Sequence, residues 1–373
     1  MLKSSVNLGH IAGIPVRIHI SWFLIFVLVT WNLAGAVFPQ RYPGWSPGLY
    51  LGAGLITSLL FFASVLLHEL AHSLVARWRG LPVHHITLFI FGGVSEISEE
   101  PETPATEFLM ALVGPLTSLL LGGLFLAVGA LARGAGQLPA VLCLYLGEIN
   151  ISLGLFNLIP GFPLDGGRVL RSILWQRGRN LPRATRIASL VGQGVAYLFI
   201  MVGVWQIFAG QWGSGIWIAF IGWFLDNAAQ ASYRQMAVKN MLAGHTVREI
   251  MTQDCYPLPP TVPLDELVRG HLLATGQRCF AIVQNSQLTG LLTLHNIKKV
   301  PQGRWATVTV GQVMTPLAQL KVVRPDDGLW SAMQEMTEEG VNQLPVMEGG
   351  RLVGMLGRDN LVGFIRVHAE LGM

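Results

Sequence analysis

The sequence predicts a polytopic α-helical membrane protein of about six transmembrane helices with a re-entrant β-hairpin, joined to a soluble α/β unit. Of the 373 residues, 51% are hydrophobic and only 12% are charged, about half the charged fraction of an average soluble domain. Apolar runs fill residues 1–235, whereas residues 241–373 have the mixed composition of a soluble domain and contain an internal repeat. The net charge of +4 is modest and the arginines cluster in short loops, so we expect no nucleic-acid partner.

Six segments of the first part are expected to cross the membrane. Each is predominantly apolar, and most have the ~20 residues that a helix needs to span the hydrocarbon core. Arginines follow the second and the fourth segment, which predicts that these ends, and with six spans both termini, lie in the cytoplasm. The segments are 18–37, 51–78, 108–131, a fourth that begins near 140, 187–208 and 212–225.

Between the second and third segments, residues 85–97 predict a β-hairpin. They are rich in β-branched and aromatic side chains and have Gly92-Gly93 in the middle. The stretch is too short for another helical span and would suit a re-entrant hairpin if protein shields its backbone from lipid. The glycine pair is consistent with a simple turn and also with a loop that contacts a substrate.

The second segment carries a motif with metal chemistry. Glu69 is the only formally charged side chain between Arg41 and Arg77, and it lies between His68 and His72. A carboxylate at the centre of a membrane helix costs about 2.5–3.5 kcal/mol, so a functional role is the default interpretation. Histidines at i and i+4 share one helix face and can bind one Zn²⁺, with the intervening glutamate beside it as a base. The sequence therefore predicts a zinc site inside the membrane.

A catalytic zinc site usually has three protein ligands, so a third is expected elsewhere. The extended HExxH motif would place a histidine where Trp78 stands. The best candidate is Asp165 in the sequence NLIPGFPLDGG, whose prolines and glycines break the helix near membrane depth. Such backbone is tolerated only against protein or a water-filled cavity, and hydrolysis consumes water. Glu96 is the rival ligand, and a simple Asp-Gly turn is the other interpretation of Asp165.

With HELAH and NLIPGFPLDGG both present, residues 8–230 resemble the site-2 protease family of intramembrane zinc metalloproteases. The resemblance implies that Gly92 and Gly93 belong to a loop beside the substrate and that Gly114-Pro115 is a structural motif. It also implies two histidine zinc ligands, an aspartate zinc ligand, a catalytic carboxylate and an amide that steadies the substrate or the oxyanion, namely His68, His72, Asp165, Glu69 and Asn157.

The second part of the chain repeats itself with a period of about 63 residues. Val-Arg-Glu-Ile-Met-Thr at 247–252 matches Val-Gly-Gln-Val-Met-Thr at 310–315, and helix-like and strand-like segments follow each copy. The pattern resembles a tandem pair of CBS (cystathionine-β-synthase-like) motifs, at about 241–300 and 304–373. This resemblance implies two copies that pack against each other and a pair through which the chain could form a homodimer.

Nucleotide binding by the CBS pair is an open question. Ligand-binding copies of the family usually carry Thr or Ser three residues after the strand glycine, and Asp six residues after it, for a ribose. The first copy has Thr293 but Asn296, and the second has Gly357 and Asn360, with Asp359 one place early. An adenine nucleotide held by Thr293 and Asp359 is one hypothesis, and a dimerisation or substrate-positioning platform is the other.

The sequence favours an intramembrane zinc endopeptidase with one Zn²⁺ per chain, which cuts peptide bonds in or near the transmembrane segments of membrane-anchored proteins. The expected partners are the lipid bilayer and a single-span substrate, such as a membrane-tethered transcription regulator or an anti-sigma factor. The family branch with CBS motifs implies a prokaryotic plasma membrane. Two alternatives are a CBS-gated ion transporter or channel, with the His68–His72 cluster along its path, and a catalytically silent relative.

Overall fold

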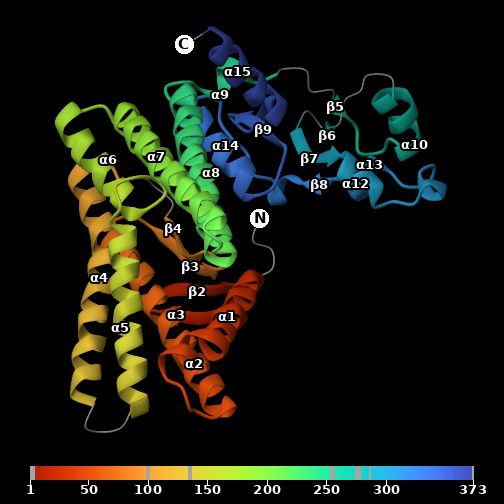
Figure 1. The fold of residues 1–373 in the computed structure, drawn as a ribbon. Helices are drawn as coiled ribbons and strands as arrows, with labels where there is room; N and C mark the ends of the chain where they lie inside the picture. The colour runs from red at the N-terminus through yellow and green to blue at the C-terminus, as the bar shows by residue number, and fades with distance from the viewer. Residues whose placement is uncertain are drawn as a thin grey trace. The chain divides into compact units, whose positions relative to one another are not determined.

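The structure is a computed structural model of the chain, and it describes residues 5–97, 101–132, 137–252, 257–273, 279–284 and 287–371. The chain divides into two compact units, Met1–Met236 and Ala237–Met373, which are described in turn (Figure 1). The first unit holds long helices and a four-stranded sheet, and the second holds the short helices and strands of the repeat.

Long apolar helices dominate the first unit. Five described segments are long and apolar enough to cross a membrane: Ile20–Arg41, which comprises α1 (Ile20–Asn32), a π-helical turn (Leu33–Val37) and α2 (Phe38–Arg41), then α3 (Pro47–Trp78), α4 (Pro104–Leu131), α5 (Gln137–Asn157) and α7 (Leu181–Phe208). The sixth expected span, 212–225, forms the first part of a longer helix, α8 (Trp212–Leu242), which is not among these five. A total of six spans therefore stays a prediction.

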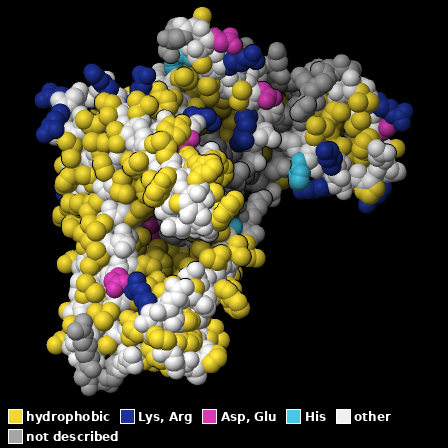
Figure 2. Space-filling view, viewed as in Figure 1, with side chains coloured by type: hydrophobic (Ala, Val, Ile, Leu, Met, Phe, Trp, Pro, Cys, Tyr) yellow, Lys and Arg dark blue, Asp and Glu magenta, His cyan; other side chains and the backbone are white. Residues whose placement is uncertain are grey.

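The surface of the first unit is that of a membrane protein. Hydrophobic side chains cover the flanks of its helices in Figure 2, and Leu120, Trp205 and Phe208 are among the exposed ones. Lys and Arg side chains gather at the end of the bundle where α6 (Asp165–Gly178) ends and α7 begins. The exposed arginines of this stretch are Arg177, Arg179, Arg183 and Arg186.

A four-stranded sheet packs against α3 and contains the expected hairpin. The hairpin consists of β3 (Val83–Phe89) and β4 (Gly92–Ile97), and its turn lies at Ile90-Phe91, ahead of the glycine pair that was expected in the middle. β1 (Ser5–Ile11) and β2 (Ile14–His19), where no strands were expected, complete the sheet in the order β1-β2-β3-β4. β2 pairs in parallel with β3, so the two inner strands join the sheet at its centre. β1 and β4 are therefore the edge strands.

The first helix begins two residues later than expected because Ile18 and His19 end β2. Ile14, Val16 and Ile18 are buried in alternation along this strand, which is the period of two that a half-buried strand requires. His19 then caps the helix, since its Nδ1 accepts a hydrogen bond from the backbone N–H of Ser21 at 3.2 Å.

α4 and α5 run side by side (Figure 1), and glycines let their backbones approach closely. A Cβ on Gly122 of α4 would lie 3.1 Å from the carbonyl oxygen of Gly147 on α5. A Cβ on Gly154 of α5 would lie 3.0 Å from the carbonyl oxygen of Pro115 on α4. Small residues at such crossings are typical of helices that associate within a membrane. α4 is thereby fixed against α5, and it also packs against α3 and α6.

The second unit contains both copies of the repeat. Its main elements are α9 (Val247–Ile250), β5 (Pro257–Leu258), α10 (Leu264–Glu266), β6 (Cys279–Gln284), β7 (Gln287–Thr293) and α12 (Leu294–Lys298), followed by α13 (Val310–Val313), β8 (Thr315–Pro316), α14 (Leu329–Glu338), β9 (Gln343–Glu348), β10 (Arg351–Gly357) and α15 (Arg358–Leu371). Its strands form two sheets, in the orders β5-β6-β7-β8 and β10-β9.

The two copies exchange their leading segments. Val247, at the start of the first copy, is fully buried in the core of the second copy with Leu329 and Leu344. Val310, at the start of the second copy, is fully buried in the core of the first copy with Phe280. Backbone pairing repeats this exchange, because β8 of the second copy pairs with β7 of the first. Each core is therefore completed by the other copy.

Candidate metal centre

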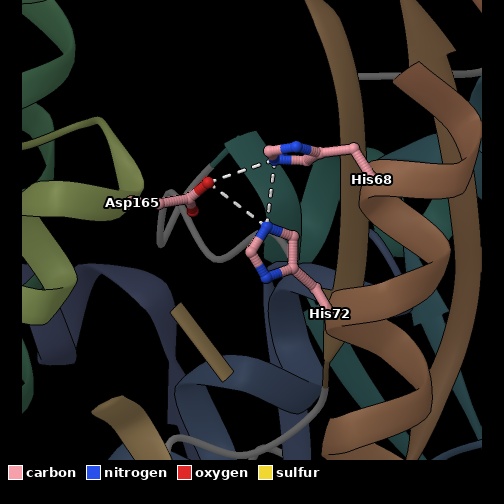
Figure 3. Close-up of side chains that lie close together, drawn as sticks. All are labelled: His68, His72 and Asp165. Carbon is pink, nitrogen blue, oxygen red and sulfur yellow. Dashed lines mark hydrogen bonds and ion pairs between the residues drawn. The ribbon is translucent and has the colours of Figure 1, made fainter. Parts of the chain in front are cut away.

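His68 and His72 project from the same side of α3 (Figure 3). Both side chains are buried, and their Nε2 atoms lie 3.2 Å apart. Positions i and i+4 are one helical turn apart, so the sequence spacing itself produces this pair. The helix is long and continuous through the motif, which fixes the two imidazoles relative to each other.

Asp165 reaches the histidine pair from a distant part of the chain (Figure 3). It is the first residue of α6, and its Oδ2 lies 3.1 Å from Nε2 of His68 and 3.2 Å from Nε2 of His72. The three ligand atoms lie within 4.8 Å of one another, and among the described residues these side chains form the group that could hold a metal ion. The two stretches that the sequence singled out thus meet in one place.

The glycines around Asp165 allow the preceding loop to fold tightly. A Cβ on Gly166 or Gly167 would collide with backbone atoms of that loop, so larger residues do not fit there. The backbone N–H of Phe162 donates to the carbonyl oxygen of Ala188 at 3.2 Å, which ties the loop to α7. The loop therefore places the start of α6, and with it the carboxylate, opposite α3.

The geometry of the three atoms fits zinc. Ligands at the ~2.0 Å length of a zinc–nitrogen bond lie about 3.3 Å apart on the edges of a tetrahedron. The separations of 3.1 Å and 3.2 Å among the two Nε2 atoms and Oδ2 are close to that value. Two histidines and one carboxylate are also the donor set of a catalytic zinc site, which leaves the fourth position for water or substrate.

The second nitrogen of each imidazole is held by α4. Nδ1 of His68 lies 2.9 Å from Oγ of Ser118, and Nδ1 of His72 lies 2.5 Å from the carbonyl oxygen of Met110, to which it donates. Hydrogen bonds of this kind fix the ring orientation and the tautomer of a metal-binding histidine. They leave each Nε2 free to face the metal position.

Gly114 of α4 provides the space in which the two rings meet. A Cβ at this position would collide with Nε2 of His72 and would lie 2.7 Å from Nε2 of His68. The sequence predicted a loosened backbone at Gly114-Pro115. The close approach of the two imidazoles also explains why a glycine occupies this position, because any side chain would fill the space where the metal would bind.

Glu69 lies between the two histidines in sequence and contacts β4. Oγ of Ser95 donates to Oε2 of Glu69 at 3.1 Å, and Ser73 donates in turn to Ser95 at 3.0 Å. Gly93 packs so closely against Glu69 that a Cβ on it would collide with the glutamate side chain. The hairpin thus holds the carboxylate in a defined position, and this gives Gly93 a contact that its sequence did not reveal.

Three other expected residues lie outside the group of His68, His72 and Asp165. Asn157 ends α5, and its amide donates to the carbonyl oxygen of Leu153 at 3.0 Å. Glu96, the rival ligand, faces His85 across the hairpin with its Oε2 2.8 Å from Nε2. Gly92 begins β4 with φ of 127°, a conformation that favours glycine, and has open space where a Cβ would lie.

Known proteins show the same combination of units. Peptidase family M50 matches residues 56–141 and 135–202, and the CBS domain matches residues 247–303 and 310–367. Rip3 of Mycobacterium tuberculosis is 34% identical to this chain, and the alignment covers 98% of this chain and 94% of Rip3. The chain belongs to peptidase family M50, the site-2 proteases.

Other relatives of this M50 peptidase also align over nearly its whole length. Protein sll0528 of a Synechocystis species is 36% identical over 99% of this chain and 97% of its own length. The zinc metalloprotease MJ0392 of Methanocaldococcus jannaschii is 27% identical over 97% of this chain and 96% of its own length. Among solved structures, a site-2 protease from the same archaeon is 29% identical with a TM-score of 0.44, covering 62% of this chain and 95% of that chain.

Family membership decides between the function classes that the sequence left open. The chain is a membrane zinc metallopeptidase with a tandem CBS pair, so a CBS-gated ion transporter is set aside. The polar groups on α3 are then candidates for the metal site of such a peptidase rather than for an ion path.

The CBS pair of the M50 peptidase uses its asparagines to cap helices. Oγ1 of Thr293 donates to Oδ1 of Asn296 at 2.6 Å, and the backbone N–H of Gly357 donates to Oδ1 of Asn360 at 2.9 Å. Each asparagine stands at the position where ligand-binding copies carry a ribose-binding aspartate. Asp359 is exposed in the first turn of α15.

Sequence reasoning did not identify the hydrogen-bond partners of the metal centre. Ser118, Met110 and Ser95 contact the site from another helix and from the hairpin, and contacts between distant elements leave no local pattern. One available indication was the spacing of Gly114 and Ser118. Gly114 and Ser118 are four residues apart, as His68 and His72 are. Residues at this spacing lie on one face of a helix, so the two pairs can face each other across two neighbouring helices.

Proposed function

We propose that this M50 peptidase is an intramembrane zinc endopeptidase that hydrolyses peptide bonds in or near the transmembrane segments of membrane-anchored proteins. The observation that carries the proposal is the convergence of His68, His72 and Asp165 from α3 and α6 at zinc-binding distances. Its surroundings support a membrane location, because α3 is one of the five helices long and apolar enough to span a bilayer.

In this proposal the three side chains hold one zinc ion, which when bound supplies Lewis-acid chemistry to a carbonyl and to a water molecule. Glu69 acts as the general base: its carboxylate takes the proton from the attacking water and passes it to the leaving amine. Ser95 supports this role because its hydroxyl donates to Oε2 and fixes the direction of the carboxylate.

Asn157 is proposed to donate a hydrogen bond to the tetrahedral oxyanion. Its amide now donates to Leu153 within α5, so this role requires the amide to leave that bond when substrate arrives. Comparing Asn157→Ala with Asn157→Asp tests this role. Loss of turnover with unchanged zinc content in both variants is expected, and full turnover in both would remove Asn157 from the mechanism.

The substrate is proposed to be a single-span membrane protein that unwinds locally and pairs with β4. A helix hides its backbone groups, and an edge strand such as β4 offers a row of unpaired N–H and C=O groups to an extended chain. β4 also contacts Glu69 through Ser95 and Gly93, which brings this edge next to the proposed base. Candidate substrates are membrane-tethered transcription regulators and anti-sigma factors.

Both termini are proposed to lie in the cytoplasm of a prokaryotic cell, with the chain crossing the plasma membrane several times. The exposed arginines at the junction of α6 and α7 support this orientation. In cells, a cysteine placed at Arg179 should react with a membrane-permeant reagent only, whereas a cysteine at Pro43 should react with an impermeant one. The reverse pattern would invert the topology.

The CBS pair is proposed to modulate the peptidase, either by binding an adenine nucleotide near Thr293 and Asp359 or as a platform for dimerisation or substrate positioning. Calorimetric titration of a 241–373 fragment, which lies within the compact unit Ala237–Met373, with ATP, ADP and AMP separates the two. Heat that disappears in Asp359→Ala supports the nucleotide, and no heat with any of the three favours the platform.

Metal analysis of the detergent-purified protein tests the central proposal. Wild type is expected to hold about one zinc per chain, because the described residues contain one three-ligand group of this kind. His68→Ala and Asp165→Ala should each lose it, whereas His10→Ala, at an exposed position on β1, should not. Glu69→Gln should keep the zinc and lose cleavage of a reconstituted single-span substrate. Zinc retained in both ligand variants would refute the site.

A further inference from the structure

Glu107 of α4 and Arg171 of α6 form a buried ion pair within the first unit. Glu107 is fully buried and Arg171 is 7% exposed. Nε of Arg171 donates to Oε1 of Glu107 at 2.5 Å, and its Nη2 contacts the same oxygen. The guanidinium also lies over the ring of Phe162, 5.2 Å from its centre. Burying two charges is costly, and loss of either partner would leave an uncompensated buried charge, so this contact between the two helices depends on both residues.

The pair belongs to the same face of α4 that orients the metal-binding histidines. Glu107, Met110, Gly114 and Ser118 are spaced as i, i+3, i+7 and i+11, which is one stripe along a helix. Met110 and Ser118 hold the two imidazoles, and Gly114 leaves room for them. Glu107 lies one helical turn further along this stripe, and it contacts α6 instead of α3.

Arg171 and Asp165 lie on different faces of the short helix α6. Arg171 follows Asp165 by six residues, which corresponds to ~9 Å along the helix axis and about 120° around it. Asp165 therefore faces the histidines of α3 while Arg171 faces α4. Phe162, in the loop before Asp165, is held by the same guanidinium. α6 is thus anchored to α4 at a point close to its metal ligand.

We propose that Glu107 and Arg171 are positioning residues for Asp165. Their ion pair sets the height and rotation of α6 against α4, so that the carboxylate of Asp165 meets Nε2 of His68 and His72 at metal-binding distance. This inference rests on the proposed zinc site and adds the contact that joins its two halves. α4 then positions both halves of the site, because one stripe of it contacts the two histidines of α3 and also α6, the helix that carries Asp165.

The zinc dissociation constant of the full chain in detergent, measured by competition with a chromogenic chelator, tests the proposal. Glu107→Gln keeps the size of the side chain and removes its charge, whereas Glu107→Asp keeps the charge and shortens the side chain. Loss of an orienting partner weakens metal affinity about 10- to 100-fold. We expect that loss in Glu107→Gln and Arg171→Met, and a smaller one in Glu107→Asp. Arg177→Met, exposed near the end of the same helix, should match wild type.

The order of the two Glu107 variants separates positioning from packing. A weaker zinc affinity in Glu107→Asp than in Glu107→Gln would assign the pair to packing alone and overturn the proposal, as would wild-type affinity in Arg171→Met. If Glu107→Gln does not fold, the double variant Glu107→Gln with Arg171→Met removes both buried charges. Weakened zinc binding in the folded double variant supports the proposal, and unchanged binding overturns it.

Asp165→Ala is measured beside these variants to keep the two proposals separate. If Asp165→Ala loses zinc while the Glu107 and Arg171 variants bind it normally, the zinc site stands and the positioning role fails. If Asp165→Ala binds zinc as wild type does, the zinc site itself is wrong.

Discussion

Because a Cβ at Gly114 would collide with His72 and lie 2.7 Å from Nε2 of His68, we expect Gly114→Ala to displace both rings. Overpacking a tight site costs about 1–3 kcal/mol, which corresponds to roughly 5- to 150-fold weaker zinc binding if the strain falls on the ligands. The chelator competition assay measures this loss. Gly123→Ala is the matched control, because it lies on the same helix and has open space where its Cβ would lie. Equal affinity in both variants would contradict the prediction.

Ser95 offers a way to disturb the proposed base without touching the metal ligands. Ser95→Ala removes the hydroxyl that donates to Glu69, so the carboxylate loses its fixed direction. A small misplacement of a catalytic group costs up to about 100-fold in rate, and we expect a fall in kcat of roughly 10-fold or more with unchanged zinc content. Ser64→Ala, whose hydroxyl donates to the carbonyl oxygen of Leu60 in its own helix, serves as the control in the same cleavage assay. A kcat equal to that of wild type would show that Glu69 needs no such support.

At the scale of residues, the sequence could identify the candidate metal ligands but not the residues that form hydrogen bonds with them. HELAH and NLIPGFPLDGG each point to a polar residue in an apolar setting, and the structure brings His68, His72 and Asp165 together. The i, i+4 spacing works because it lies within one helix. Ser118 and Glu107 contact residues on other helices, and the sequence does not indicate which helix packs against α3 or α6.

At the scale of elements, the sheet tests whether substrate docks as an added strand. A proline in β4, at a position whose N–H points away from β3, would leave the hairpin intact and block pairing along the free edge. We expect slower cleavage of a single-span substrate with unchanged zinc content. The control is a proline on the outer side of β1, the opposite edge of the same sheet. Cleavage as fast as wild type in the β4 variant would refute docking on this edge.

The hairpin itself was predictable, but the sheet that contains it was not. β-branched residues and glycines mark 85–97 as strands, and β3 and β4 form there. β2 pairs in parallel with β3 across more than sixty residues of chain, and only the alternation of Ile14, Val16 and Ile18 indicated it. A strand of six residues beside a long apolar helix is easily assigned to that helix, and this is why Ile18 was expected in the first span.

At the scale of the whole molecule, the repeat revealed two similar halves in the second unit but not how they share their cores. Matching letters at 247–252 and 310–315 identify equivalent segments, and equivalence does not say which core a segment enters. Glycines make the exchange sterically possible. A Cβ on Gly354 of β10 would lie 2.9 Å from the carbonyl oxygen of Thr252, and one on Gly290 of β7 would lie 2.5 Å from that of Thr315.

The exchange predicts that the two CBS copies unfold together. Val247 belongs to the first copy and is fully buried in the core of the second, so Val247→Ala should destabilise the 241–373 unit by about 1–3 kcal/mol in a single cooperative urea transition. Val310→Ala, its counterpart in the other core, should have a similar effect, and Val362→Ala, at an exposed position on α15, should change stability by less than about 0.5 kcal/mol. Two separate transitions, with Val247→Ala shifting only one of them, would show that each copy folds alone. A single transition shifted by both buried variants means that a disturbance in either copy reaches the other, as a modulating unit requires.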